Sequence, residues 1–323
     1  DNSTNWSKRV CQKMRKVELV GRQVKTCKLH IPVMPFVAMA AAETKDACQV
    51  VFAQRRWNCS SVTTAPEHTP DLTRGSREQS VVHALSAAAV AHSVAKACSS
   101  GDLHLCTCGQ LPNEPPNGDF KWGGCADNVE FGTSFSRLFV DAPYARRNKK
   151  KKARSMNAIA MMNVHNHEAG RKTLETSLTS RCKCHGVSGS CEIKTCWRVL
   201  QPLRVIGDKL KMRYGVAMEV VRTRIGTRHQ LMPLTARRGL HTEHDLVYIE
   251  KSPDYCWPEP ETGSVGTRGR FCDETDNGHY GCMSMCCGRP YDSYNVEVVE
   301  RCKCKYIWCC YVKCEVCKRW EKR

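Results

Sequence analysis

Twenty-three cysteines in 323 residues constrain this chain more than any other feature. A reducing cell compartment would keep so many thiols unpaired, so the count predicts a secreted protein with disulfide bonds. Twelve cysteines lie up to Cys196, none lies between Cys196 and Cys256, and eleven lie in the last 68 residues. That last segment is too short and polar to bury a large core. We therefore expect several disulfides, at roughly 2–4 kcal/mol each, to hold it together.

The middle of the chain has a second cysteine pattern, which reads S-R-C-K-C-H-G-V-S-G-S-C-E-I-K-T-C over residues 180–196. Cys184 can pair with Cys191, and the two outer cysteines can form a second bridge around that loop. The loop contains two glycines, which permit tight or left-handed backbone. The spacing predicts a doubly bridged hairpin that presents Ser188 at its tip.

Other features agree with secretion. The chain starts at Asp1 without an apolar signal region, so we expect that a signal peptide has been removed. No apolar run approaches about 18 residues, so we expect no membrane span. Three sequons predict glycosylation at Asn2, Asn5 and Asn58.

The net charge of +18 favours anionic partners. For a secreted protein these are sulfated glycosaminoglycans and membrane surfaces. Nucleic acid would need aromatic residues interleaved with the basic ones and a cell compartment that the cysteine count argues against, so we expect no nucleic-acid partner. The densest basic run is a candidate heparan sulfate site, with an ordinary solvated loop as the alternative; its cations are Arg146, Arg147, Lys149, Lys150, Lys151, Lys152 and Arg154.

Apolar periodicity divides the chain into a helical part and a β-rich part. Residues 1–221 are expected to form a mainly α amino-terminal domain with disulfide-pinned β-hairpins, including the hairpin at 182–196. Residues 222–254 are polar and are interpreted as a linker. Residues 255–323 are expected to form a small cystine-rich domain with a β-hairpin at about 299–317. The expected helices cover 35–56, 77–98, 127–139, 157–178 and 202–223.

Catalytic and metal chemistry fit the sequence poorly. The residues around Ser188 resemble a nucleophile elbow, but the second glycine has the wrong spacing, and no carboxylate is nearby to orient His185. The paired cysteines lack the histidines and the reducing compartment typical of zinc sites. We therefore expect no enzyme, metal or cofactor. Two other classes remain as alternatives, namely a secreted lipid hydrolase with saposin-like helices and a matrix protein that binds glycosaminoglycan by charge alone.

The central cysteine pattern resembles the signature of the Wnt family of secreted signalling proteins. Details near residues 100–103, 252–256 and 308–314 look nearest the subfamily usually numbered eleven. Further blocks of the chain resemble the same family, in the right order: R-R-W-N-C-S-S (55–61), W-G-G-C-A-D-N (122–128), H-E-A-G-R (167–171) and V-E-R-C-K-C (299–304).

The resemblance implies the two-domain Wnt fold, with the acylated hairpin as a "thumb" and the carboxy-terminal hairpin as an "index finger". Together they would grip the cysteine-rich domain of a Frizzled receptor and trigger signalling, with the β-catenin-independent branch as one candidate. A monounsaturated fatty acyl chain would be attached covalently to Ser188. Other implied partners are pathway co-receptors, an acyltransferase, an export carrier that grips the lipid, and a membrane surface reached through that lipid.

The resemblance also implies individual site residues. Receptor contacts would come from Val187 and Ser188 on the thumb, and from Ile307, Trp308, Cys309, Cys310, Tyr311 and Val312 on the index finger. The implied disulfides of the first domain are Cys11–Cys27, Cys48–Cys59, Cys98–Cys106, Cys108–Cys125, Cys182–Cys196 and Cys184–Cys191. Those of the second are Cys256–Cys287, Cys272–Cys282, Cys302–Cys317, Cys304–Cys314 and Cys309–Cys310.

The chain departs from the family pattern in two places. Family chains commonly end in one more cysteine, so we expect an incomplete carboxy terminus here and no partner for Cys286. The asparagine-linked sites of the nearest subfamily are also missing, because Asn128 and Asn277 do not begin sequons.

Overall fold

The structure is a computed structural model that describes residues 5–15, 19–64, 69–116, 118, 120–144, 156–235, 239–308 and 311–322. The chain forms two compact units. Unit 1 contains residues 1–53, 59–253 and 261–263. Unit 2 contains residues 54–58, 254–260 and 264–323.

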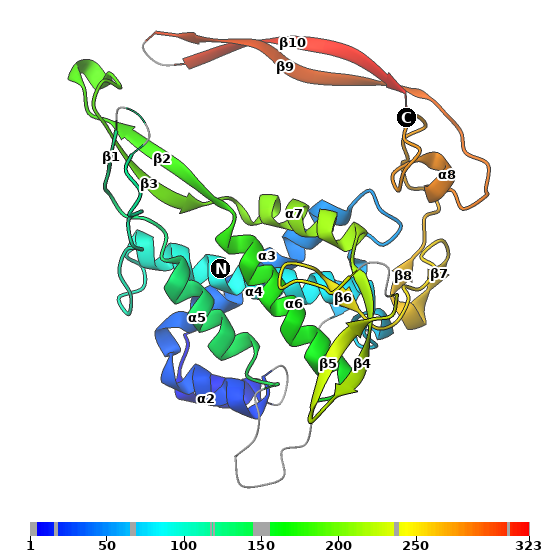
Figure 1. Cartoon of the computed structure of the whole chain (residues 1–323). Helices are drawn as coiled ribbons and strands as arrows, with labels where there is room; N and C mark the ends of the chain where they lie inside the picture. Colours follow the sequence, from blue (N-terminus) through cyan, green and yellow to red (C-terminus); the bar gives the residue numbers. More distant parts are fainter. Residues whose placement is uncertain are drawn as a thin grey trace. The chain divides into compact units, whose positions relative to one another are not determined.

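Unit 1 is mainly helical, as expected (Figure 1). Four of the expected helices begin and end within a few residues of the expected bounds. The fifth is shorter than expected, because it ends at Gly215 and a strand begins at Met218. The helices of unit 1 are α1 (Lys8–Met14), α2 (Gly21–Leu29), α3 (Met34–Phe52), α4 (Arg77–Ser100), α5 (Val129–Val140), α6 (Ala158–Glu175) and α7 (Leu203–Gly215), with 3-10 turns η1 (Ile31–Val33), η2 (Ser60–Thr64), η3 (Pro70–Leu72) and η4 (Val187–Gly189).

Helix α4 is the centre of unit 1. It packs against α3, α5, α6 and α7, and most of its alanines are fully buried. Ser76 caps its first turn through the Gln79 backbone amide, and Gly101 ends it in the left-handed conformation. By length and composition α4 is the one helix in the described part of the chain that passes the test for a membrane span. We had expected no apolar run long enough to span a membrane, and α4 is one by length and composition. Burial of α4 inside unit 1 accounts for its apolar character.

Glycines let the neighbouring helices approach the α4 backbone. A Cβ atom at Gly170 of α6 would lie 1.9 Å from the Ala84 carbonyl oxygen, and one at Gly132 of α5 would lie 2.3 Å from the Ala91 oxygen. No side chain can occupy either position at these distances. The close contact of α5 and α6 with α4 therefore depends on these two glycines.

The H-E-A-G-R block forms a charged cluster on α6. The buried Arg171 donates to both Asp141 and Glu168, and Asp141 also accepts from His167 Nδ1 at 2.7 Å. Burial alone would raise the pKa of Glu168, but hydrogen bonds from Arg137 and Arg171 lower it to about 2. No group of three or more His, Cys, Asp or Glu residues in the described part is arranged to hold a metal ion. His167, Glu168 and Arg171 of the block form an ion-pair network with Asp141 and Arg137.

Two three-stranded sheets belong to unit 1, with strand orders β1-β3-β2 and β5-β4-β6. Apart from the start of β4, which begins at Met218, the second sheet lies in the segment 222–254 interpreted as a linker, and residues up to Pro253 belong to unit 1. Val220, Leu231 and Val247 pack there with Met162 of α6. These widely spaced apolar residues form a core that the polar composition of 222–254 hides. The strands are β1 (Phe120–Trp122), β2 (Leu178–Cys184), β3 (Lys194–Leu200), β4 (Met218–Ile225), β5 (Arg228–Pro233) and β6 (Val247–Tyr248).

Unit 2 combines short elements with one long hairpin. A segment that precedes it by about 200 residues in sequence belongs to it, because Arg56 Nε donates to the Ser284 oxygen and Arg270 donates to the Arg56 oxygen. Trp57 from the same segment is 3% exposed. The elements are β7 (Pro258–Glu259), η6 (Pro260–Thr262, shared with unit 1), β8 (Ser264–Val265), α8 (Cys282–Met285), β9 (Asn295–Ile307) and β10 (Tyr311–Lys322).

Within the described residues, ten disulfides form, and they are the same pairs that the family resemblance implies. The eleventh implied pair, Cys309–Cys310, lies outside the described residues. Cys286 has no disulfide partner among them, and its sulfur lies 3.9 Å from that of Cys272.

We predict that Gly170→Ala lowers the free energy of unfolding by about 3 kcal/mol, because the new methyl group meets the Ala84 backbone rather than a movable side chain. Chemical denaturation followed by helical circular dichroism measures this. Gly215→Ala is the matched control, since a Cβ there meets nothing within 4 Å. Equal stability of the two variants would contradict the close packing of α4 and α6.

We predict that acidification destabilises unit 1 through His92. Burial, followed by repulsion from Lys96, lowers the pKa of this side chain to about 4. Its Nε2 atom contacts the Gln201 oxygen at 3.1 Å, and its Nδ1 atom is buried without a hydrogen-bond partner in the described structure. In the unfolded chain this histidine binds a proton near pH 6.5, whereas in the folded chain it binds one only near pH 4. The free energy of unfolding therefore falls as the pH drops from about 6.5 to 4.

The His92→Gln variant should lose about 2–3 kcal/mol less stability over this pH window than the parent chain. Denaturant titrations at several pH values measure the difference, with the exposed His104→Gln as control. Parallel pH profiles for parent and His92→Gln would show that another group carries the acid sensitivity.

Candidate functional site

Strands β2 and β3 of unit 1 form a hairpin with two disulfide bridges. The strands pair antiparallel with Cys182 opposite Cys196, and these two cysteines are bonded. Closer to the tip, Cys184 is bonded to Cys191. Strand β1 pairs parallel with β3 on its other side, so β3 is the central strand of this sheet.

The tip of the hairpin is a tight turn whose shape requires Gly186. The Gly186 amide donates to the Ser190 oxygen at 2.9 Å, and the Gly189 amide donates back to Gly186 at 3.0 Å. A Cβ at Gly186 would lie 1.9 Å from Ser190 Oγ. Ser188 has φ 56° and ψ 24°, which is the left-handed region that non-glycine residues rarely adopt. The ring of contacts thus holds a serine in an unusual backbone conformation.

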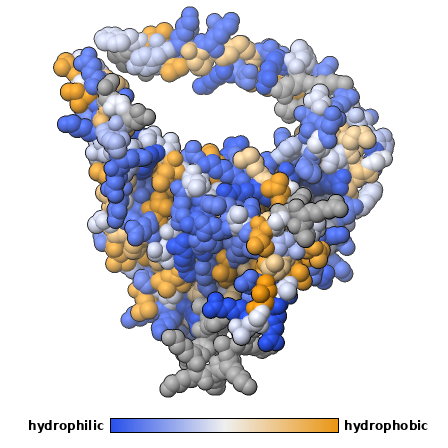
Figure 2. All heavy atoms as spheres, viewed as in Figure 1, coloured by the Kyte–Doolittle hydropathy of each residue, from blue (hydrophilic) through white to orange (hydrophobic). Residues whose placement is uncertain are grey.

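Side chains at the tip point to solvent. Val187 is 91% exposed, Ser188 is exposed, and Ile193, just before β3, is 66% exposed. Hydrophobic atoms gather visibly at the outer end of this hairpin (Figure 2). The Ser188 hydroxyl has no hydrogen-bond partner in the part of the chain that the structure describes. The tip therefore offers a free hydroxyl beside exposed apolar side chains.

Contacts at the hairpin base fix its direction relative to α4. Asp127 accepts a hydrogen bond from the Leu200 amide at 2.7 Å and another from Ser99 Oγ of α4. The Gln201 amide donates to the Ser177 oxygen at 3.1 Å. Asp127 lies in one of the family-like blocks, but its contacts could not be predicted from the sequence, because its partners are 28 and 73 residues away. Ile193 was also missed as a tip residue.

A second hairpin, β9–β10, carries the index-finger residues of unit 2. Cys302–Cys317 and Cys304–Cys314 cross-link its strands. Its end is apolar and exposed, with Trp308 90%, Tyr311 60% and Val312 58% accessible and Ile307 at 39%. Cys309 and Cys310 lie outside the described residues. Each unit thus has its own bridged hairpin with an apolar end.

The remaining predicted sites are described only in part. Asn2 and the basic run from Arg146 to Arg154 lie outside the described residues, and Asn5 is exposed. Asn58 is half-buried. It precedes Cys59, which is bonded to Cys48 and has φ 61°, and Ser60 Oγ donates to the Gly263 oxygen. The two residues that follow Asn58 in the sequon are thus held by a disulfide and a hydrogen bond.

Comparison with known proteins shows which family this chain belongs to. The model of the Wnt family matches residues 15–323. Wnt-11b-2 of Xenopus tropicalis and Wnt-11 of Gallus gallus are each 47% identical over 305 residues, covering 94% of this chain and 85% of the relative. Both relatives agree with the resemblance to the subfamily numbered eleven.

A solved structure gives the same result. The structure of human WLS in complex with WNT8A has a chain 33% identical to this one, with a TM-score of 0.60 and coverage of 98% of both chains. The expected architecture of a helical amino-terminal part and a cystine-rich carboxy-terminal hairpin is thereby confirmed. The lipid hydrolase alternative is wrong, because these matches extend over nearly the whole chain. The chain belongs to the Wnt family of signalling ligands.

Proposed function

We propose that this chain is a secreted, acylated ligand that binds the cysteine-rich domain of a Frizzled receptor. The observation that carries the proposal is the exposed Ser188 at the tip of a doubly bridged hairpin in a Wnt family member. The hydroxyl is accessible to an acyltransferase, and the turn holds it away from the body of unit 1. No cofactor is proposed besides the covalent acyl chain.

The acyl chain supplies most of the receptor affinity in this proposal. Burial of each methylene is worth about 0.8 kcal/mol, so a long chain contributes on the order of 10 kcal/mol before ordering costs. Val187 and Ile193 extend the apolar contact around the chain. The same lipid anchors the ligand at membrane surfaces and is gripped by an export carrier, by analogy with the human WNT8A complex with WLS.

The index-finger hairpin supplies a second apolar contact with the receptor. Exposed tryptophan and tyrosine on a cross-linked hairpin are typical of binding hot spots, because the rings are already ordered before binding. The remaining proposed partners are pathway co-receptors and heparan sulfate, the latter through the basic run Arg146–Arg154, which retains the ligand in the extracellular matrix. Signalling through the β-catenin-independent branch is the accompanying hypothesis.

We predict that Ser188→Ala abolishes acylation and weakens Frizzled binding at least about 100-fold, since the lipid is the main apolar contact. Intact-mass spectrometry of secreted protein and binding to a Frizzled cysteine-rich domain measure the two effects. Ser190→Ala, which removes a hydroxyl two residues away, should keep both the acyl mass and the affinity. Fully active protein with an unmodified Ser188 would overturn the proposal.

We predict that Trp308→Ala weakens Frizzled binding by about 2 kcal/mol or more, with secretion retained. Trp320→Ala is the control, because Trp320 is 70% exposed on the same hairpin but lies at its base. A collapse of secretion in Trp308→Ala would identify a core residue. Unchanged binding would remove the index finger from the receptor contact.

A further inference from the structure

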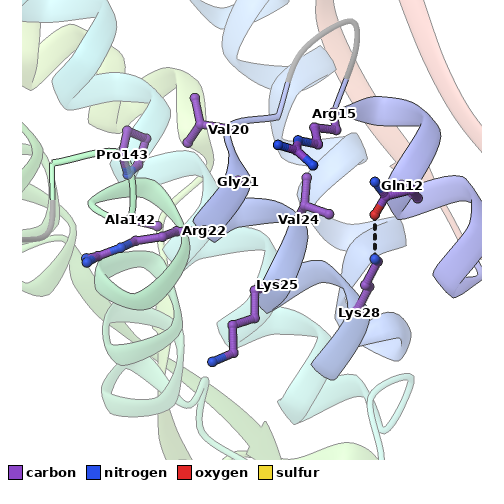
Figure 3. Close-up of a pocket in the computed structure, with 10 residues that line it drawn as sticks. All are labelled: Gln12, Arg15, Val20, Gly21, Arg22, Val24, Lys25, Lys28, Ala142 and Pro143. Atoms are coloured by element: carbon purple, nitrogen blue, oxygen red, sulfur yellow. Dashed lines mark hydrogen bonds between the residues drawn. The ribbon is translucent and has the colours of Figure 1, made fainter. Parts of the chain in front are cut away.

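A hollow of about 710 Å³ lies between α1, α2 and the turn that follows α5. It is distinct from both hairpins, and no residue of it belongs to the receptor contacts proposed above. Figure 3 shows its lining, which consists of Gln12, Arg15, Val20, Gly21, Arg22, Val24, Lys25, Lys28, Ala142 and Pro143.

The walls of the hollow are held in place by covalent and polar contacts. Cys11 of α1 is bonded to Cys27 of α2. Lys28 donates to Gln12 across the same pair of helices, and Gln23 Nε2 donates to the Phe139 oxygen of α5 at 3.3 Å. A ligand therefore meets a preformed surface, which lowers the ordering cost of binding.

The hollow carries a concentrated positive charge. Four of its ten lining residues are cations, namely Arg15, Arg22, Lys25 and Lys28, and none of the described lining residues is acidic. A concave surface lined by one sign of charge raises the local concentration of the opposite ion. The ligand class is therefore anionic.

The distribution of charge favours a linear ligand over a compact one. In Figure 3 the charged ends of Arg15, Arg22 and Lys25 lie at separate points around the hollow and do not converge. Arg22, Lys25 and Lys28 follow one side of α2 at three-residue intervals, which corresponds to a rise of about 4.5 Å per step. Between the cations the surface is apolar, with Val24 at 5% and Ala142 at 6% exposure beside Val20 and Pro143.

We propose that this hollow binds a stretch of sulfated polysaccharide. Sulfate groups spaced along the chain would contact the separate cations, and the C–H faces of the sugar rings would lie on the apolar surface between them. A phospholipid headgroup concentrates its charge at one point and fits this arrangement less well. The inference deepens the proposed heparan sulfate contact and rests on it. It adds a structured site to the basic run, which begins three residues after Pro143 in the sequence.

The test compares two triple variants of the full chain. The hollow variant is Arg15→Gln, Arg22→Gln, Lys25→Gln; it keeps Lys28, which holds Gln12. The control variant is Lys8→Gln, Arg9→Gln, Lys13→Gln, which removes three exposed cations of α1 outside the hollow. The probe is a size-defined heparin oligosaccharide, with its desulfated form as the negative control. Affinity is measured as a function of salt.

The hollow variant should bind heparin about tenfold more weakly, as expected from the loss of three ionic contacts. The control should change less than about twofold on the same basis. The single Lys25→Glu variant, at an exposed position, repeats the test if the triple variant folds poorly. Equal losses in the hollow and control variants would show that only net charge matters and would overturn the inference.

A third variant, in which all seven cations of Arg146–Arg154 are changed to Gln, separates this inference from the proposed function. Loss of heparin binding there, with none in the hollow variant, would overturn the hollow and leave the basic run as the site. Loss of heparin binding in the hollow variant, with none in this third variant, would support the hollow as the site and would show that the basic run is not needed for heparin binding. In a Ser188→Ala background, binding to phosphatidylserine vesicles that depends on the hollow, without heparin binding, would identify a lipid site and overturn the inference.

Discussion

Disulfide bonds are the constraint on which both hairpins depend, because a two-stranded hairpin buries too little apolar surface to be stable alone. In β9–β10 nearly every described side chain is exposed or only half-buried, and two cross-strand bridges hold the strands together. The thumb has the same arrangement, with one bridge between paired residues and one closing the tip. Covalent bonds thus replace a core at the two hairpins, whose tip side chains are exposed.

Unit 1 is stabilised in the opposite way. Its buried residues gather along α4, where alanines and the glycines of α5 and α6 bring helix backbones close together. The thumb is rigid because its base is tied to this core through Asp127 and Gln201. Well-packed helices thus orient a hairpin that has no core of its own, and the exposed tip keeps a fixed position on unit 1.

Helices α3 to α7 were predictable from the sequence because their apolar residues recur at helical spacing over several turns. The short helices α1 and α2 were not predicted. The second sheet was not, since Val220, Leu231 and Val247 come from short strands separated by polar residues. Nor was the assignment of residues 54–58 to unit 2, which depends on contacts with residues more than 200 positions away. Long-range contacts of this kind leave no periodic pattern in a sequence.

The candidate site was predictable to different degrees. Spacing suggested the nested thumb bridges, whereas the pairing in unit 2 came only from the family resemblance, because eleven cysteines allow very many connectivities. The hollow between α1 and α2 was missed. Three of its cations lie on α2 in an ordinary basic sequence, and Arg15 at the end of α1 joins them only because the Cys11–Cys27 bond brings the two helices together.

The left-handed conformation of Ser188 has a consequence for every protein that would act on it. This conformation costs a non-glycine residue about 1 kcal/mol, so serine itself does not favour it. Hydrogen bonds of Gly186, Gly189 and Ser190 and the closed ring impose it from outside. None of those contacts uses the hydroxyl. Esterification of the oxygen would therefore leave these hydrogen bonds in place, and a transferase, a carrier and a receptor would all meet the same turn.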